Sequence, residues 1–155
     1  MKTERRSILK KLTLSVLGFA GFRSLAKAET ISEDKMKIAS GVIMDQEVPL
    51  FSSFTKLGNL VFIAGKGAHY AGDIKQHTET VLQDLEKELI NAGSSMKNVL
   101  KVSVFLNDIA DYDGMNSVYR GRFGDKPPVR TTVAVAKGGV PGNSLVEMDC
   151  IAYVS

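Results

Sequence analysis

Residues 127–154 read PPVRTTVAVAKGGVPGNSLVEMDCIAYV, and the expected fold follows from this stretch. It contains two runs of strand-forming residues, Thr131–Ala136 and Leu145–Val154, on either side of a glycine-rich connection, Gly138–Asn143. Short β-branched runs bounded by glycine and asparagine are typical of paired strands. We therefore predict a β-hairpin here, or two neighbouring strands joined by an elaborated loop.

Each of these two predicted strands contains charged residues in an otherwise apolar setting. Arg130 opens the first strand, and Glu147 and Asp149 lie inside the second. Because residues two apart in a strand share a face, both carboxylates point the same way. An arginine that faces carboxylates across paired strands forms either a structural ion pair or a binding site for an anion, and the local pattern leaves both open.

The length and composition indicate one globular domain. The 155 residues are 44% apolar and 24% charged, as is ordinary for such a domain. Residues 1–28 contain seven of the 20 Lys/Arg and one of the 17 Asp/Glu, which leaves 13 basic and 16 acidic residues, a net charge of −3, in residues 29–155. This mildly acidic body does not favour non-specific attraction of nucleic acid, so we predict no nucleic-acid partner.

The chain has one cysteine, Cys150, and two histidines, His69 and His77. One cysteine cannot form an intramolecular disulfide, and the sequence has no Cys/His cluster of the kind that binds zinc. We therefore expect no metal site. His69 lies in a glycine-rich loop, either on the surface or at the rim of a pocket, whereas His77 falls on the polar face of a predicted helix and has no expected chemical role.

Residues 1–28 are similar to an export signal. A basic segment precedes an apolar run, Leu12–Phe22, and Ala26-Lys27-Ala28 fits a small-residue cleavage site. The apolar run is too short to span a bilayer, which takes about 20 residues. Arg5-Arg6 resembles the twin-arginine motif, so we predict a periplasmic protein, residues 29–155, without membrane contact once the signal is cleaved. An uncleaved amphipathic anchor is the alternative.

Two helices are predicted from the spacing of apolar residues. Between Ile74 and Leu89 these recur every three or four positions, with Asp73 as the N-cap and Ala92-Gly93 as the stop. Asp108–Phe123 is typical of a loop followed by a second helix, and Asn116 falls within that helix.

Strands are predicted on both sides of these helices. Lys35–Met44 and Phe54–Gly65 precede the first helix, the latter as two runs around the turn Leu57-Gly58-Asn59. Val99–Leu106 separates the helices, and Val48–Ser53 is predicted to be a loop. The resulting order, β-β-α-β-α-β-β, indicates an α+β two-layer sandwich in which two helices cover one face of a mixed sheet.

The other face of this predicted sheet indicates self-association. Leu60–Ile63 and Val99–Phe105 are too continuously apolar for one side of each strand to remain in water. The body has no further element to cover that face, so we expect other subunits to bury it.

Several motifs, in order and at acceptable spacing, resemble the reactive intermediate deaminase family (RidA/YjgF type). The most specific is Pro-x-Arg before a strand, followed after a loop by Val-Glu-Met-x-x-Ile-Ala in residues 146–152. The resemblance covers about residues 36–154, and it implies a chorismate-mutase-like fold and a trimer with three clefts between subunits. The further matching segments are Phe51–Asn59, Ala92-Gly93-Ser94, Val102–Asp108 and Met115-Asn116-x-x-Tyr119.

The resemblance also implies a function and a site. Members of this family hydrolyse enamines and imines derived from amino acids, such as 2-aminoacrylate, to 2-keto acids and ammonia. It implies that Arg130 binds the substrate carboxylate, which a planar guanidinium can pair with bidentately, and that Glu147 orients or activates the attacking water. The other residues implied at the substrate-binding site are Asn116, Gly65, Phe51 and Thr132.

Three positions depart from the family pattern. Phe51 replaces a tyrosine, Ala64 a serine and Thr132 a frequent cysteine, so carboxylate recognition looks intact while the polar lining is altered. We therefore consider two functions: a cofactor-free deaminase of a small carboxylate-bearing metabolite, and a protein of the same fold that binds a keto acid or amino acid without turnover. A purely structural pairing of Arg130 with Glu147 is a third interpretation.

Overall fold

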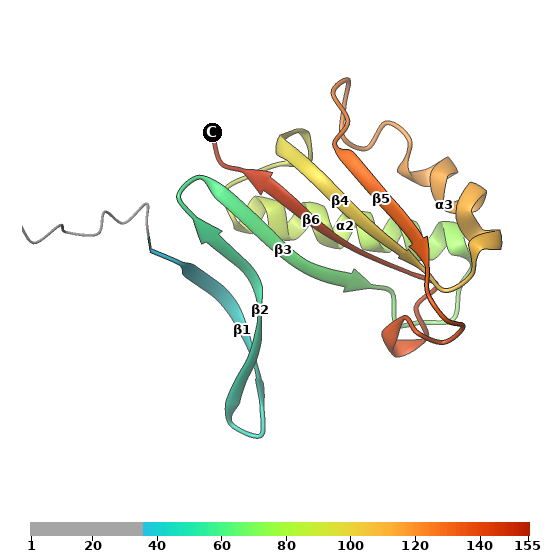
Figure 1. The fold of residues 1–155 in the computed structure, drawn as a ribbon, viewed down its shortest axis with the longest axis horizontal. Coiled ribbons are helices and arrows are strands. Elements are labelled where there is room, and N and C mark those ends of the chain that lie inside the picture. Colours follow the sequence, from blue (N-terminus) through green and yellow to red (C-terminus); the bar gives the residue numbers. More distant parts are fainter. Residues whose placement is uncertain (1–35) are drawn as a thin grey trace, which may run out of the picture. The chain divides into compact units, whose positions relative to one another are not determined.

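The computed structural model describes residues 36–155, and the predicted export signal lies outside them. The described residues form one sheet of six strands in the order β1-β2-β3-β6-β4-β5 (Figure 1). β4 and β5 are parallel, and every other neighbouring pair is antiparallel. No helix within residues 36–155 is long and apolar enough to cross a membrane. The strands are β1 (Ile38–Asp45), β2 (Val48–Leu57), β3 (Leu60–Gly67), β4 (Val99–Leu106), β5 (Val129–Ala134) and β6 (Val146–Tyr153).

Two helices, α2 (Ile74–Asn91) and α3 (Tyr112–Tyr119), lie against one face of this sheet (Figure 1). Asp73 caps α2 as predicted: its carboxylate accepts from the Gln76 N–H, and the Gln76 side chain accepts from the Asp73 N–H. This capping box satisfies donors that the first turn leaves unpaired. The buried side chains of both helices and of β3, β4 and β6 form one core. The predicted α+β class is therefore confirmed.

One predicted loop is a strand. Val48–Ser53 belongs to β2, where Pro49 pairs with Met44 of β1. β3 pairs only with Phe54–Leu57 of β2. The first half of β2 therefore needs no hydrogen bonds on its second side, and such a position tolerates proline. The predicted order has five strands because it counts Phe54–Gly65 once, whereas the structure divides this range between β2 and β3. The loop is predicted because a proline indicates a loop wherever the pairing of the strand is unknown.

The predicted pairing of the two C-terminal strands is also wrong. β4 lies between β5 and β6, parallel to the first and antiparallel to the second. Val102 of β4 lies opposite Arg130 on one side and Cys150 on the other, and Phe105 lies opposite Glu147. Residue pattern identifies a strand but not its neighbour, so a hairpin and two separated strands look alike in sequence.

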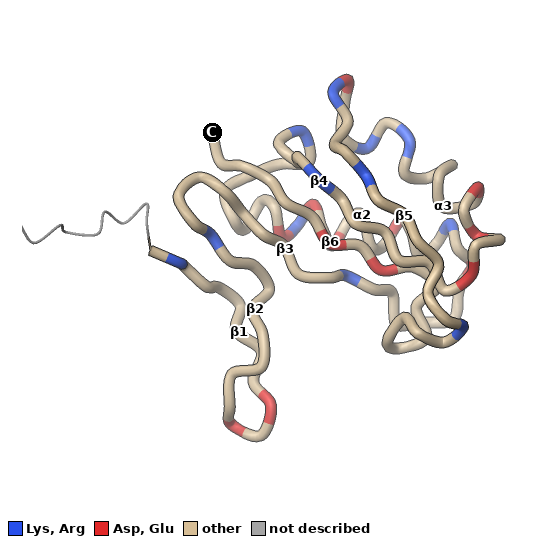
Figure 2. The backbone as a smooth tube through the Cα atoms, in the orientation of Figure 1, with Lys and Arg blue, Asp and Glu red and all other residues tan. Residues whose placement is uncertain are grey.

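The sheet face away from the helices has no cover among the described residues, and it mixes apolar side chains with the charged Lys101, Glu147 and Asp149. Phe62 and Val133 are 40% and 43% exposed on it. β1 and the first half of β2 form an arm that extends from the sheet (Figure 1), and Figure 2 shows few charges along this arm. This surface agrees with the expected self-association, which stays a prediction. The exposed apolar residues of the arm are Ile38, Val42, Ile43, Met44, Val48, Leu50 and Phe51.

His77 is buried, contrary to its predicted place on a polar helix face, and it is 1% exposed. Its Nε2 lies 2.9 Å from the Tyr70 carbonyl oxygen, and its Nδ1 lies 3.0 Å from the Leu145 amide nitrogen. Because a carbonyl only accepts and an amide N–H only donates, the ring is the neutral tautomer with its proton on Nε2. The imidazole thus connects the loop after β3 to the loop before β6.

We expect His77→Leu to destabilise the fold, because it leaves the Leu145 N–H and the Tyr70 carbonyl without their partner. Each unpaired buried group costs about 1–3 kcal/mol. Chemical denaturation should show a free energy of unfolding lower by roughly 2–5 kcal/mol. Lys75→Ala, on the exposed side of α2, should change it by less than about 0.5 kcal/mol. Equal stability of the two variants would contradict the role given to His77.

Candidate functional site

Arg130 lies on the helix side of β5, next to α3. Its Nη1 donates to Asn116 Oδ1 (2.8 Å) and its Nη2 to the Tyr112 hydroxyl (3.2 Å). The guanidinium carbon lies 4.7 Å from the centroid of the Tyr119 ring, within cation–π range. Three side chains of one short helix therefore fix the orientation of the guanidinium. Asn116, implied as a substrate residue, contacts Arg130 directly.

The spacing of these three residues explains why α3 can hold Arg130. Positions 112, 116 and 119 are i, i+4 and i+7, so their side chains share one face of the helix. Tyr119 and its neighbour Met115 also belong to the core, which anchors α3 against the sheet. We call Tyr112, Asn116 and Tyr119 the α3 cradle.

Burial keeps the hydroxyl of Tyr119 neutral. It raises the pKa of Tyr119 to about 12, and the nearby positive charge of Arg130 opposes that rise. Neither the Tyr119 hydroxyl nor Thr132 Oγ1 has a hydrogen-bond partner among the described residues. Thr132 is two positions beyond Arg130 on β5, so it faces the same side of the sheet.

A pocket of about 580 Å³ opens beside Arg130. A guanidinium has five N–H groups, and the α3 cradle occupies one on each terminal nitrogen. The remaining N–H groups can pair with a carboxylate in the planar geometry that suits arginine. The pocket is lined by Asp113, Asn116, Ser117, Tyr119, Arg120 and Arg130.

Glu147 lies on the opposite, uncovered face of the sheet. It alternates along β6 with Val146 and Met148, which are fully buried against the helices. Its carboxylate lies against Gly65 of β3, where a Cβ would be 2.9 Å from Glu147 Cδ. Any side chain at position 65 would displace that carboxylate. Gly65 therefore belongs to the site because it leaves room for Glu147.

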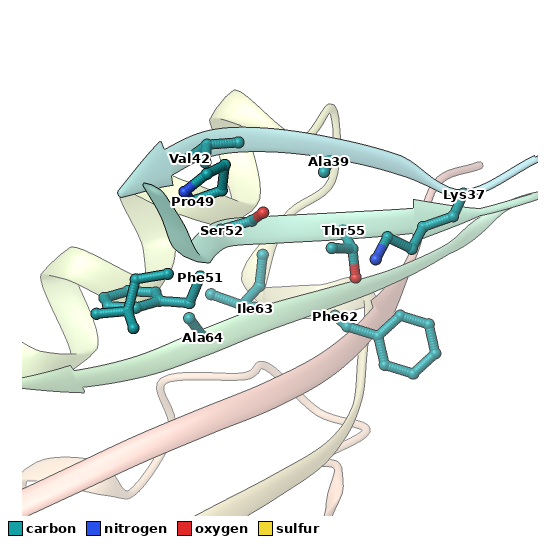
Figure 3. A pocket seen from close by; sticks show the side chains of 11 residues that line it. Lys37, Ala39, Val42, Pro49, Phe51, Ser52, Thr55, Phe62, Ile63 and Ala64 are labelled. Atoms are coloured by element: carbon teal, nitrogen blue, oxygen red, sulfur yellow. The ribbon is translucent and has the colours of Figure 1, made fainter. Parts of the chain in front are cut away.

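Phe51 and Ala64 line a second pocket, of about 520 Å³, between the β1–β2 arm and β3 (Figure 3). The two side chains lie close together there, and Phe51 is 53% exposed. Both positions lack the hydroxyl expected from the family pattern. Two of the three departures therefore meet in a pocket of mixed lining, where Lys37, Ser52 and Thr55 are the polar residues.

The predicted site residues thus form two groups on opposite faces of the sheet. The predicted facing of Arg130 and Glu147 across paired strands is wrong for a single chain, because β4 separates their strands and the alternation turns them apart. Salt bridges between described residues involve neither side chain. We call Arg130, Asn116 and Thr132 the arginine group, and Glu147, Gly65 and Phe51 the glutamate group.

Sequence reasoning missed Tyr112 altogether. Its i, i+4 spacing to Asn116 is visible in the sequence, but it gains meaning only once Arg130 is known to face α3. His69 lies in a loop beside Gly142, with Nδ1 3.4 Å from the Gly142 carbonyl oxygen. It lines a pocket with His77 that is separate from both groups.

Comparison with known proteins identifies the family. Residues 46–154, most of the chain, match the family model described as Endoribonuclease L-PSP. The chain belongs to this family, which includes the RutC, YjgF and RidA proteins. The resemblance seen in the sequence is therefore confirmed.

Two of the similar proteins are named as deaminases. A RutC family protein of Pyrococcus abyssi is 36% identical, over 75% of this chain and 98% of that protein. A 3-aminoacrylate deaminase RutC of Acinetobacter baylyi is 35% identical, over 64% of this chain and 83% of that protein. The chloroplastic Reactive Intermediate Deaminase A of Arabidopsis thaliana is 30% identical, over 83% of this chain and 67% of that protein. The crystal structure of E. coli TdcF with bound serine is 25% identical, with a TM-score of 0.65 over 76% of this chain and 94% of that chain.

We expect the Cys150 thiol to be unreactive in the folded protein. Burial, and then the neighbouring negative charge of Asp149, raises the pKa of Cys150 to about 12, so at pH 8 only roughly one thiol in ten thousand is a thiolate. Iodoacetamide at pH 8 should label the unfolded chain fully and the folded chain hardly at all, as mass spectrometry can measure. Rapid labelling of the folded chain would show that this part of β6 opens.

Proposed function

We propose that this protein hydrolyses imines and enamines derived from amino acids, of the 2-aminoacrylate type, to 2-keto acids and ammonia without a cofactor. The main support is the guanidinium of Arg130, which the α3 cradle orients and whose free N–H groups border a pocket. Two relatives are named as deaminases, and a structural neighbour is described with bound serine, a small molecule with a carboxylate.

We further propose that each site lies between two chains of a homotrimer. The arginine group of one chain then meets the glutamate group of its neighbour. Support comes from the opposite orientation of these groups within one chain and from the apolar side chains, such as Phe62 and Val133, that stay exposed on the uncovered face. An interface of this kind buries that face and brings both charges to one small substrate.

In this reaction the imine carbon is the electrophile. Arg130 holds the carboxylate, and Glu147 of the neighbouring chain takes a proton from water as the water oxygen bonds to C2. The π electrons of the C=N bond move to nitrogen, which receives that proton from Glu147, and a carbinolamine results. Glu147 then transfers the hydroxyl proton of the carbinolamine to nitrogen, the C–N bond breaks with its electron pair leaving on ammonia, and C2 becomes the keto carbonyl. Imine and water thus give 2-keto acid and ammonia. An enamine first takes a proton at C3 to become the imine.

The family description names an endoribonuclease, but the charge of this chain favours the small-molecule reaction. Residues 29–155 have a net charge of −3, and RNA binding depends strongly on neutralising phosphates with Lys and Arg. The arginine group offers one oriented cation, which matches one carboxylate. Binding without turnover is the second candidate, because Phe51 and Ala64 lack the hydroxyls of the family pattern.

We also propose export to the periplasm, on the basis of the twin-arginine pattern in residues 1–28. Fractionation of cells that express the full chain, before and after Arg5-Arg6 is replaced by two lysines, tests this proposal. A cytoplasmic location of the unaltered chain would overturn it.

We expect Arg130→Ala to lower kcat/KM for imine hydrolysis by about 100-fold, because it removes charge-assisted hydrogen bonds to the carboxylate. The kcat/KM of Arg130→Lys should lie between those of the unaltered protein and Arg130→Ala, since lysine keeps the charge but lacks the planar guanidinium. Arg122→Ala is the matched control, because Arg122 pairs with Glu79 and lies outside both groups. The measurement is keto-acid and ammonia release from an amino-acid oxidase reaction with and without the protein.

Full activity of Arg130→Ala would show that the site is misassigned. If the unaltered protein causes no acceleration but is thermally stabilised by 2-ketobutyrate, the non-catalytic binding protein is the better description.

Mixing two inactive variants tests whether the site is shared. Chains with Arg130→Ala keep the glutamate group, and chains with Glu147→Gln keep the arginine group. Co-expressed trimers with random mixing should recover about one quarter of the activity, since each shared site needs one intact half from each of two chains. Each variant alone should be nearly inactive.

A second mixture sharpens this result. Here the unaltered chain is mixed in equal amounts with a chain that carries both Arg130→Ala and Glu147→Gln. A shared site again predicts about one quarter of the activity of the unaltered trimer, whereas a site within one chain predicts about one half. Light scattering should give the mass of three chains. No recovery in mixed oligomers of the two single variants would contradict the shared site.

A further inference from the structure

A small pocket adjoins Glu147 on the uncovered face of the sheet. Its volume is about 180 Å³, and it lies where the loop between β5 and β6 meets β4. Glu147 is the one charged residue among the described residues that line it. The lining residues are Phe105, Val135, Gly139, Val140, Pro141 and Glu147.

Hydrogen bonds hold the loop that forms one wall of this pocket. Near its start the Gly138 N–H donates to Asn107 Oδ1 (2.7 Å), and near its end the Leu145 N–H donates to His77 Nδ1 (3.0 Å). Within the loop Val140 is buried. The wall is therefore fixed by the fold, as expected for a pocket that exists before its ligand arrives.

Gly139 allows the loop to approach Val135 closely. A Cβ at position 139 would lie 2.7 Å from the Ala136 carbonyl oxygen and 3.1 Å from a methyl carbon of Val135. A larger residue there would push the loop away from Val135, so glycine sets the width of this pocket.

The size and lining of the pocket suit an apolar group of several carbons. A cavity of about 150 Å³ lined by aliphatic and aromatic side chains can hold benzene, and this pocket is slightly larger. The methyl group of an alanine-derived imine would fill little of it. A branched aliphatic or phenyl group would fill most of it and remove more apolar surface from water.

We propose that this pocket receives the side chain of the substrate, so that the enzyme prefers imines of branched-chain and aromatic amino acids to the small 2-aminoacrylate type. This inference rests on the proposed function. The imine carbon has three substituents. Arg130 takes the carboxylate and Glu147 serves the nitrogen and the water, so the third substituent meets the wall beside Glu147, which is apolar.

The test compares imines generated in the reaction mixture by an L-amino-acid oxidase from alanine, leucine and phenylalanine. The rate of keto-acid release is measured with and without the full chain. We expect kcat/KM for the leucine and phenylalanine imines to exceed that for the alanine imine by at least about tenfold, because each further buried methylene adds apolar contact.

Val135→Phe fills the pocket and should reverse this preference. It should lower kcat/KM for the two large imines by about tenfold or more, and kcat/KM for the alanine imine by a clearly smaller factor. Val135→Leu adds less bulk and serves if Val135→Phe does not fold. Ile90→Phe, at a helix position that is 63% exposed, is the matched control and should change none of the three rates.

A binding measurement separates this inference from the proposed function. Thermal stabilisation by 4-methyl-2-oxopentanoate should exceed that by pyruvate, and Val135→Phe should abolish the difference. If no imine is hydrolysed but this difference is seen, the pocket assignment holds and the deaminase function fails. If imines are hydrolysed with equal efficiency, or Val135→Phe lowers all rates alike, the pocket does not select the side chain.

Discussion

The alternation of side chains across the sheet limits what one chain of this protein can do. β4 lies between β5 and β6, and its register turns Arg130 toward the helices and Glu147 toward the uncovered face. The backbone of the sheet lies between the two side chains, so a substrate of a few carbons cannot touch both within one chain. Assembly and catalysis are therefore a single requirement of the proposed function, because the face that the proposed trimer would cover is also the face that holds Glu147.

The arginine half of the site depends on a helix that cannot stand alone. An isolated helix as short as the eight residues of α3 is marginal in water, so its packing against the core keeps it formed. Tyr119 belongs to that core and also stacks against Arg130. The packing that keeps α3 folded therefore also orients the guanidinium of Arg130. Because the guanidinium is already oriented, it loses little further conformational entropy when a carboxylate binds. This arrangement explains why the site needs a helix that is anchored in the core, here by Met115 and Tyr119.

Local and family patterns predicted much of this molecule, and the errors have a common cause. The apolar spacing of α2, its Asp73 cap and the apolar run of β4 depend on near neighbours, and these were correct. Which strands pair depends on contacts far apart in sequence, and no residue pattern in 127–154 reveals that β4 inserts between β5 and β6. His77 was misplaced for the same reason, because its partners come from two distant loops. The motifs located Arg130 and Glu147, but only the register could show that they face apart.

The departures from the family pattern are consistent with one another once the pockets are considered together. Phe51 and Ala64 remove hydroxyls on the uncovered face, and the wall beside Glu147 is apolar as well. In the pocket beside Glu147, a polar side chain of a substrate would leave its hydrogen bonds with water and find few replacements, which disfavours its binding. An apolar side chain loses nothing there and gains burial. In the proposed trimer, Arg130 of one chain would then bind the carboxylate of the substrate, and the apolar pocket beside Glu147 of the neighbouring chain would bind its side chain.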